Sequence, residues 1–261
     1  MLLRPKKSLG QNFLLDKNVI KKIINSAKIK SSDVVLEIGP GTGNLTKFIF
    51  ARNPKKIYLI EKDENLANAL ERQYLNKVNI IKDDILKIPY EFYSKERFLI
   101  LGNLPYNIST KILSEWCLNK NLVVSKMILM FQKEVAERIL ANVNSKNYSR
   151  ITILSKWKFD IKKLIDVKPN SFFPKPKVHS TVLEFVPKKK FHEIKDPKNL
   201  EKVTKVFFNQ RRKMIKKPIN ILFKNFQFNY NKFNIKSSDR PQNIDVEKYL
   251  KIVSEYEALR S

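Results

Sequence analysis

The sequence is poor in cysteine and has no long apolar run. Cys117 is the only cysteine among 261 residues, which excludes an intramolecular disulfide and a cysteine-rich metal site. The longest apolar stretches, such as Met127–Phe131, are far shorter than the roughly 20 residues that cross a bilayer. Only Leu2 and Leu3 precede the first charged residue, so we expect no signal peptide, no membrane contact and a cytoplasmic location.

Acidic residues are scarce relative to basic ones. The chain has 52 Lys and Arg against 25 Asp and Glu, a formal net charge of +27 at pH 7. Such an excess repels itself unless a polyanion neutralises it, and a basic protein gains affinity for nucleic acid by releasing condensed counterions. Nucleic acid is therefore the expected partner. The hydrophobic fraction of 43% is ordinary for a folded chain, and the length fits one large domain with or without a smaller one.

Apolar, β-branched runs of strand length alternate with amphipathic segments in the first half of the chain. The predicted strands are Val34–Ile38, Ile57–Ile60, Val78–Ile81, Phe98–Leu101 and Met127–Phe131, and the clearest helical segments are Glu64–Tyr74 and Lys133–Leu140. Continuous apolar strands separated by helices predict an α/β fold, with a mostly parallel, doubly wound sheet covered on both faces.

The second half of the chain has a different pattern. A proline-dense stretch, Lys168–Val178, precedes the alternating residues of Val178–Val186, which predict a late antiparallel strand. Lys188–Lys190 is typical of a linker, and Leu200–Ser261 carries helical patterns. We therefore expect a first domain over residues 1–189 and a small α-helical domain over residues 190–261.

Glycine is also rare, and its few positions are informative. The five glycines are Gly10, the cluster Gly39, Gly41 and Gly43, and Gly102. The cluster follows the first predicted strand and precedes a helix expected to begin near Leu45. This order lets a ligand approach bare backbone at a helix N-terminus, as nucleotide-like cofactors require.

The glycine cluster does not match the dinucleotide fingerprint. That fingerprint needs glycine where this chain has Asn44, so NAD is disfavoured. The compact Gly-x-Gly-x-Gly form resembles the first motif of class I S-adenosylmethionine methyltransferases, which are Rossmann-like. Glu61 lies 22 positions after Gly39, close to the spacing of about 20 expected for a carboxylate on ribose hydroxyls. Asp84, after the third predicted strand, is placed to accept a hydrogen bond from an adenine amine. The alternative is that Glu61 and Asp84 are merely solvated residues at strand ends.

The segment Gly102-Asn103-Leu104-Pro105-Tyr106-Asn107 follows the fourth predicted strand, at the edge where ligands bind in this architecture. An exocyclic adenine amine is a poor nucleophile until acceptors hold its hydrogens. The Asn103 side-chain oxygen and the Leu104 carbonyl can do so, while Pro105 fixes the backbone and Tyr106 stacks on the base. No general base or metal is needed, although an ordinary turn capped by Asn and Pro is the alternative.

Four segments together resemble the KsgA family of ribosomal RNA adenine dimethyltransferases, in order along nearly the whole chain. These are Lys7–Leu14, Glu37–Gly43, Asn103–Thr110 and Phe172–Ser180, with Phe208–Lys213 in the tail. The resemblance implies S-adenosylmethionine as methyl donor, and two methyl groups on each of two adjacent adenines in a hairpin near the 3′ end of small-subunit (16S) rRNA. It also implies a role in late small-subunit assembly.

The resemblance further assigns site residues. Asn12 and Leu14, in an N-terminal segment over the cofactor, would bind it together with Gly39, Gly41, Glu61, Asp84 and Asn103. Phe172 would cover the face of the adenine opposite Tyr106, although Phe173 could exchange roles with it and leave Phe172 in the core.

Basic residues near both ends are candidates for phosphate contact. Arg211, Arg212 and Lys213 lie in the basic run Gln210–Lys217, and Arg4, Lys6 and Lys7 lie near the N-terminus. The expected partner is small-subunit rRNA or an immature small subunit, bound by a monomer. Two alternatives stay open: a macrolide-resistance dimethylase of large-subunit rRNA, and a non-catalytic assembly or transcription factor on the same fold.

Overall fold

The computed structural model describes residues 5–6, 9–224 and 226–260, and the chain divides into two compact units. The first contains the described chain up to Ile112 with Asn121–Ala136 and Asp160–Pro187. The second contains Leu113–Lys120, Glu137–Phe159 and the chain from Lys188 onward. The boundary expected between residues 189 and 190 lies beside Lys188, but the second unit also takes in two earlier segments. A single cut of the chain therefore does not describe the two units.

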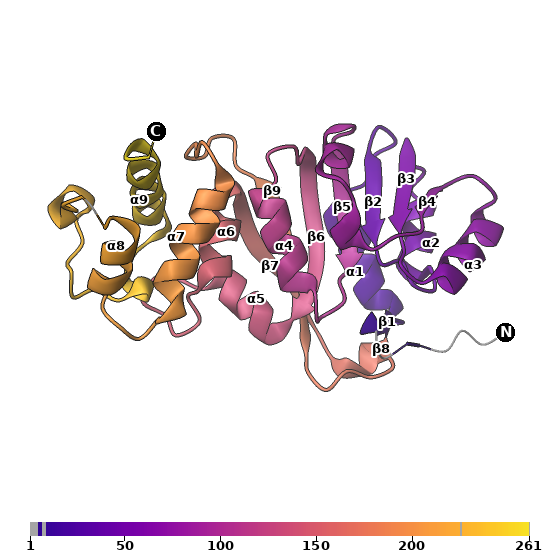
Figure 1. Ribbon diagram of the computed structural model, residues 1–261. Helices are drawn as coiled ribbons and strands as arrows, with labels where there is room; N and C mark the ends of the chain where they lie inside the picture. The colour runs from indigo at the N-terminus through magenta and orange to yellow at the C-terminus, as the bar shows by residue number, and fades with distance from the viewer. Residues whose placement is uncertain (1–4, 7–8, 225, 261) are drawn as a thin grey trace. The chain divides into compact units, whose positions relative to one another are not determined.

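The first unit is built on a mostly parallel sheet with the strand order β4-β3-β2-β5-β6-β9-β7 (Figure 1). Its strands are β2 (Val34–Ile38), β3 (Lys56–Ile60), β4 (Asn79–Ile81), β5 (Phe98–Asn103), β6 (Val124–Gln132), β7 (Phe159–Val167) and β9 (Ser180–Pro187). Ile38 at the end of β2 pairs with Ile60 of β3 and with Gly102 of β5. The carboxyl ends of the parallel strands therefore meet at one edge of the sheet, where ligands bind in open α/β folds.

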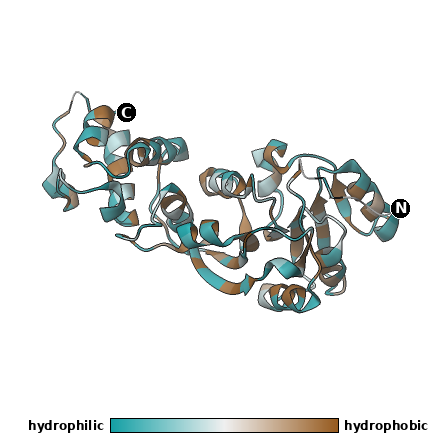
Figure 2. Ribbon diagram, turned by 90° about the horizontal axis from the view of Figure 1, so that it is seen from below, coloured by the Kyte–Doolittle hydropathy of each residue, from teal (hydrophilic) through white to brown (hydrophobic). Residues whose placement is uncertain are grey.

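Helices α1 (Lys17–Ala27), α2 (Asn44–Phe50) and α3 (Glu64–Tyr74) belong to the same unit. In α1 the buried residues Val19, Ile20, Ile23, Ile24 and Ala27 recur at helical spacing, and they join buried residues of β2, β3, β5 and β6 in one core. Figure 2 shows this division, with brown residues along the strands and teal residues on the outer faces of the helices. The predicted strand Val34–Ile38 and helix Glu64–Tyr74 have the bounds that the sequence patterns gave.

The sequence patterns did not predict β7 or the small separate sheet of β1 (Phe13–Leu14) and β8 (Phe172–Phe173). β7 ends the strand order, and its exposed residues include Lys162 and Lys163, which are typical of an edge strand. The late strand β9 does run antiparallel to β6, as expected. It is buried from Ser180 to Phe185 on both faces instead of alternating, which is typical of a strand inside a sheet that is covered on both faces.

The second unit is helical. It contains α6 (Arg150–Lys158), α7 (Pro197–Asn209), α8 (Lys216–Leu222) and α9 (Val246–Ala258), whereas α4 (Ser109–Leu118) and α5 (Lys133–Leu140) are shared between the units. The helical pattern predicted after Leu200 is thus present. Among the described residues, no helix is long and apolar enough to cross a membrane.

Candidate active site

A pocket opens in the first unit at the carboxyl edge of the parallel strands. It encloses about 1280 Å³, counting the part open to solvent. The residues predicted from the sequence that line it are Asn12, Leu14, Gly39, Gly41, Glu61, Asp84, Asn103, Leu104, Pro105 and Tyr106. The fold thus brings together residues that lie more than 90 positions apart in the sequence, because each follows or lies beside the end of a neighbouring strand.

The glycine loop forms one wall of the pocket. Gly41 has a φ of 59°, in the left-handed region, and a Cβ at this position would stand 2.8 Å from the Phe13 ring. A side chain here would both strain the backbone and displace that ring. At Gly39 a Cβ would contact only the Asn103 carbonyl oxygen, at 3.9 Å, so the space in front of this residue is open. The loop therefore offers bare backbone to a ligand.

Glu61 follows β3 and is buried in the pocket wall, with 6% of its surface exposed. Its carboxylate accepts hydrogen bonds from the backbone N–H groups of Gly41, at 3.0 Å, and Asp63, at 2.9 Å. Burial raises the pKa of Glu61, and these two N–H groups counteract part of that rise. The same bonds fix the carboxylate beside the glycine loop, with acceptor capacity left for ligand hydroxyl groups.

Asp84 follows β4 and caps the short 3-10 turn Ile85–Lys87 by accepting from the N–H of Leu86 at 3.0 Å. Its other oxygen is 2.9 Å from the Nζ atom of Lys62. Partial burial raises the pKa of Asp84, but the Leu86 N–H and the Lys62 ammonium lower it to below its ordinary value. Asp84 is therefore a carboxylate at neutral pH, able to accept a hydrogen bond from a ligand amine.

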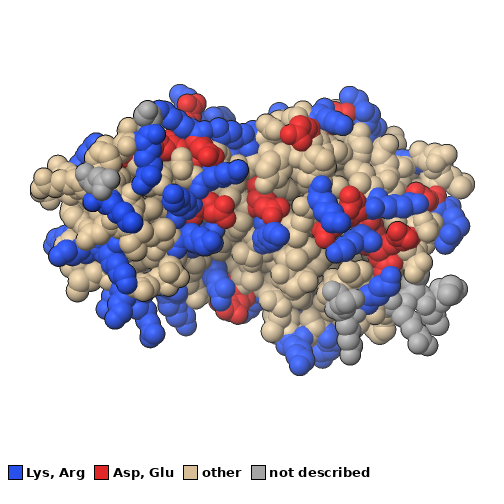
Figure 3. All heavy atoms as spheres, in the orientation of Figure 1, with Lys and Arg blue, Asp and Glu red and all other residues tan. Residues whose placement is uncertain are grey.

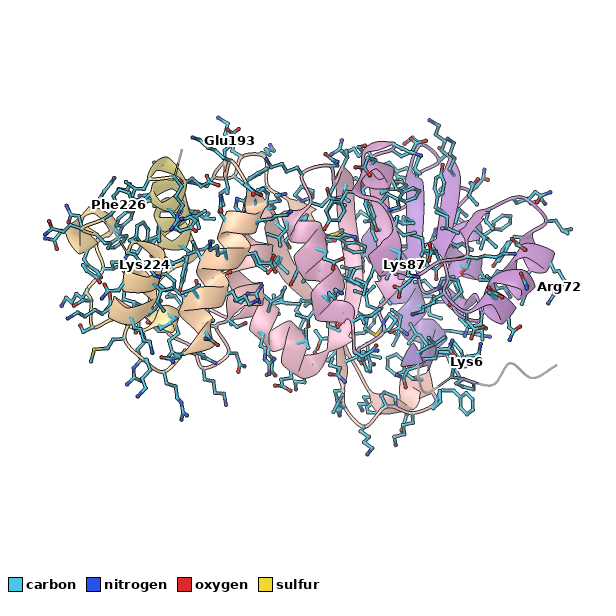
Figure 4. The ribbon with its side chains drawn as sticks, in the orientation of Figure 1. Lys6, Arg72, Lys87, Glu193, Lys224 and Phe226 are labelled. Atoms are coloured by element: carbon cyan, nitrogen blue, oxygen red, sulfur yellow. The ribbon has the colours of Figure 1, made fainter. Side chains whose placement is uncertain are left out.

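The N-terminal segment lies over the pocket and is fastened to Asp63. The Asp63 carboxylate, at the N-terminus of α3, accepts from Gln11 Nε2 at 3.1 Å and pairs with Lys6 Nζ at 3.0 Å. Figure 4 labels Lys6 beside this segment. Farther along, Asn44 Nδ2 donates to the Leu14 carbonyl at 3.0 Å. No sequence pattern singled out Gln11 or Asp63 as a site residue, although an acidic residue just before an amphipathic helix is a capping signal.

Asn103 is the last residue of β5, so the strand predicted to end at Leu101 extends two residues farther. Its Nδ2 donates to the Asn12 carbonyl at 2.7 Å, and its Oδ1 is buried without a hydrogen-bond partner. An unpaired buried acceptor costs about 1–3 kcal/mol, so it is rarely retained without a role. The Asn12 bond fixes the amide orientation and leaves the oxygen as a fixed acceptor.

Pro105 and Tyr106 form the turn that leads from β5 into α4. The Pro105 carbonyl accepts from the N–H of Ile108 at 3.1 Å and of Ser109 at 3.0 Å. The Tyr106 hydroxyl is 2.5 Å from Ser180 Oγ at the start of β9, and burial raises the pKa of this phenol. Anchored at its hydroxyl, the Tyr106 ring lies in the pocket wall, as a base-stacking residue must.

Phe172 lies in the hydrophobic core rather than in the pocket wall. It is 4% exposed and belongs to the same buried cluster as Leu14, with which it pairs between β1 and β8. Phe173 beside it is 57% exposed. Phe172 is therefore not among the residues that line the pocket, as the alternative of a core position expects, and its contact with the adenine stays a prediction.

The residues predicted to contact RNA have unequal surroundings. Arg211 donates from Nε to Gln242 Oε1 at 3.2 Å and from Nη2 to the carbonyls of Ser145 and Lys146, so its guanidinium binds loops of the second unit. Arg212 and Lys213 are exposed. Of the N-terminal candidates, Lys6 is paired with Asp63, while Arg4 and Lys7 lie outside the described residues. No cluster of three metal-ligating side chains occurs in the part of the chain that the structure describes.

Comparison with known proteins gives concordant matches. The sequence profile described as "Ribosomal RNA adenine dimethylase" matches residues 3–258. "Ribosomal RNA small subunit methyltransferase A" of Pelagibacter ubique is 51% identical over 262 residues, covering 100% of both chains. A dimethyladenosine transferase from Plasmodium falciparum superposes with a TM-score of 0.79 at 29% identity, covering 94% of this chain and 98% of the other.

The similarity to a second solved structure supports the fold of this chain and nothing further. The 23S rRNA methyltransferase ErmE has a TM-score of 0.68 and 22% identity, and the match covers 94% of this chain and 99% of that chain. With a family profile that spans almost its whole length and a relative that shares half of its residues, this protein belongs to the ribosomal RNA adenine dimethylase family.

Proposed function

We propose that this protein transfers methyl groups from S-adenosylmethionine to the exocyclic amines of two adjacent adenines in a hairpin near the 3′ end of small-subunit rRNA. The reaction adds two methyl groups to each adenine. Membership of the adenine dimethylase family and the printed name of the Pelagibacter relative support the substrate. The observation that carries the chemistry is the buried, unpartnered Oδ1 of Asn103.

An adenine amine donates its nitrogen lone pair into the ring, which makes it planar and weakly nucleophilic. Asn103 Oδ1 accepts one amine hydrogen, and the neighbouring Leu104 carbonyl accepts the other. Holding both hydrogens favours a pyramidal nitrogen whose lone pair faces the methyl donor. Because Asn103 Nδ2 is bound to the Asn12 carbonyl, the amide is oriented before substrate arrives. The nitrogen releases its proton to water after it gains the methyl group, so no general base is required.

The residues around the glycine loop fit S-adenosylmethionine. Gly39 leaves open space where a side chain would block a ligand, and Glu61 holds acceptors for ribose hydroxyls. Asp84 is a carboxylate suited to an adenine amine. When bound, the cofactor supplies an electrophilic methyl group on a positively charged sulfur. The chain's own contribution is to bind the cofactor beneath the N-terminal segment.

Two variants separate cofactor binding from methyl transfer. Glu61→Ala is expected to lose S-adenosylmethionine binding measured by calorimetry. Asn103→Ala should bind the cofactor within about threefold of wild type but lose about 100-fold or more in methyl transfer, as for removal of a fixed transition-state hydrogen bond. Asn65→Ala, which removes an exposed amide on α3, is the matched control and should keep both activities. Equal loss of cofactor and activity in Asn103→Ala would contradict the role of the amide.

The substrate is tested by mass spectrometry of rRNA from cells with and without the gene. Loss of N6-dimethyladenine from small-subunit rRNA alone is expected, whereas loss from large-subunit rRNA would favour the macrolide-resistance reading. A protein that binds immature small subunits without transferring labelled methyl groups would instead be an assembly factor. We further infer that it acts in the cytoplasm. We also infer that it is a monomer, which sedimentation of the purified protein tests.

A further inference from the structure

The small sheet of β1 and β8 presents an exposed aromatic ring beside the pocket. Phe13 and Phe173 are directly paired in this sheet, so their side chains leave the same face, with Cβ atoms about 5 Å apart. Phe13 lines the pocket and lies against the glycine loop. Phe173 is 57% exposed, and the neighbouring Leu15 is 53% exposed. An apolar surface therefore continues outward from the pocket wall.

Lysines surround this apolar surface without carboxylates among them. Lys168, Lys175 and Lys177 are exposed, and no described residue forms an ion pair with them. Between Asp166 and Glu184 the sequence contains no acidic residue. The lower tip of the molecule in Figure 3, where Figure 1 draws the loop around β8, carries blue spheres without red ones. The nearby carboxylate of Asp16 is engaged, since it accepts from Ser171 Oγ at 2.9 Å.

The segment that carries these lysines is restricted in conformation. Pro174 and Pro176 alternate with Lys175 and Lys177, and each proline ring fixes its own φ angle. Ser171 ties the base of the segment to β1, because its carbonyl accepts from the N–H of Leu15 at 2.8 Å. The backbone that carries the aromatic ring and the two lysines therefore has little conformational freedom left to lose on binding.

We infer that this surface binds the single-stranded RNA next to the target adenine. Phe173 stacks on a flanking base, and Lys175 and Lys177 contact its phosphates. This inference rests on the proposed function. An adenine that enters the pocket must leave its stack, which deprives the neighbouring base of a partner, and an exposed aromatic ring among lysines replaces that partner in single-strand recognition. The positive charge favours RNA over an apolar protein surface as the occupant.

The stacking arm of the test uses an RNA hairpin with 2-aminopurine, a base whose fluorescence falls on stacking, beside the target adenines. Full-length wild-type protein should quench it. Phe173→Ala should abolish the quenching and raise KM for the hairpin about tenfold or more, whereas Phe173→Trp should preserve both. Phe226→Ala, which removes another exposed phenylalanine (Figure 4), is the control and should behave as wild type. Thermal unfolding confirms that the variants are folded.

The charge arm measures hairpin affinity against salt concentration. The double variant Lys175→Gln, Lys177→Gln should reduce the slope of log K against log salt by about 1.4, the value for two lost contacts to single-stranded RNA. An unchanged slope, or quenching by Phe173→Ala equal to wild type, would overturn the inference. The inference would also be overturned if Phe173→Ala lost quenching only for a hairpin with 2-aminopurine in place of the target adenine, and not for the hairpin with 2-aminopurine beside it. An effect of Phe173→Ala on self-association alone would overturn it as well. Failure of the proposed function is distinguishable, because wild-type protein would then not methylate the small-subunit hairpin.

Discussion

Glu37, the fourth of the five residues of β2, is a buried acid whose proton makes stability depend on pH. It is 1% exposed, and its Oε2 accepts from Thr46 Oγ1 at 2.7 Å. Burial raises the pKa of Glu37 from 4.5 to about 8; the hydrogen bond from Thr46 lowers it, and the charge of Glu61 raises it. The folded protein therefore holds this proton at neutral pH, while the unfolded chain releases it.

The sign and size of the effect follow from this difference. A raised carboxyl pKa stabilises the folded state fully below about pH 4.5, and that stabilisation is lost as the pH rises toward about 8. Within this window the free energy of unfolding falls by about 1.4 kcal/mol per pH unit. From about pH 6 to about pH 8, wild type should lose about 2 kcal/mol relative to Glu37→Gln, whose side chain is neutral throughout.

Urea unfolding of wild type and Glu37→Gln at about pH 6, 7 and 8 measures this difference. Glu64→Gln, which changes an exposed carboxylate on α3, is the matched control and should parallel wild type. Stability curves of wild type and Glu37→Gln that run parallel over the whole range would refute the reasoning, because they would show that Glu37 has the same pKa in the folded and unfolded states.

Three further outcomes follow from contacts around the pocket. Gly41→Ala should cost about 1 kcal/mol or more of stability and weaken cofactor binding in calorimetry, since its Cβ would meet the Phe13 ring; unchanged binding would contradict this. Tyr106→Ala should raise KM for RNA about tenfold or more, whereas Tyr106→Phe keeps the ring and should stay within about threefold; equal losses would exclude stacking. Lys6→Ala should weaken cofactor binding about two- to fivefold at low salt, because the Lys6 side chain that pairs with the buried Asp63 is half exposed, and the difference should vanish at high salt.

The sequence by itself determined the parallel strands of the sheet and most of the pocket wall. The strand Val34–Ile38 and the helix Glu64–Tyr74 were predictable because their burial patterns are local, so a short window of residues contains the whole signal. Glu61 and Asn103 were predictable for a related reason. Each lies at the end of a parallel strand, and parallel strands deliver such residues to one edge whatever the rest of the chain does.

Only the tertiary structure decided which side chains face the pocket and which contacts hold them. Two adjacent phenylalanines look alike in sequence, but the pairing of β8 with β1 turns Phe172 into the core and Phe173 outward, since neighbouring residues of a strand point to opposite faces. The bond from Asn103 to the Asn12 carbonyl joins residues 91 positions apart, and local patterns carry no information about such a pairing. Arg211 likewise lies in a basic run that predicts an exposed side chain. In the folded protein its guanidinium instead donates hydrogen bonds to Gln242 Oε1 and to the Ser145 carbonyl.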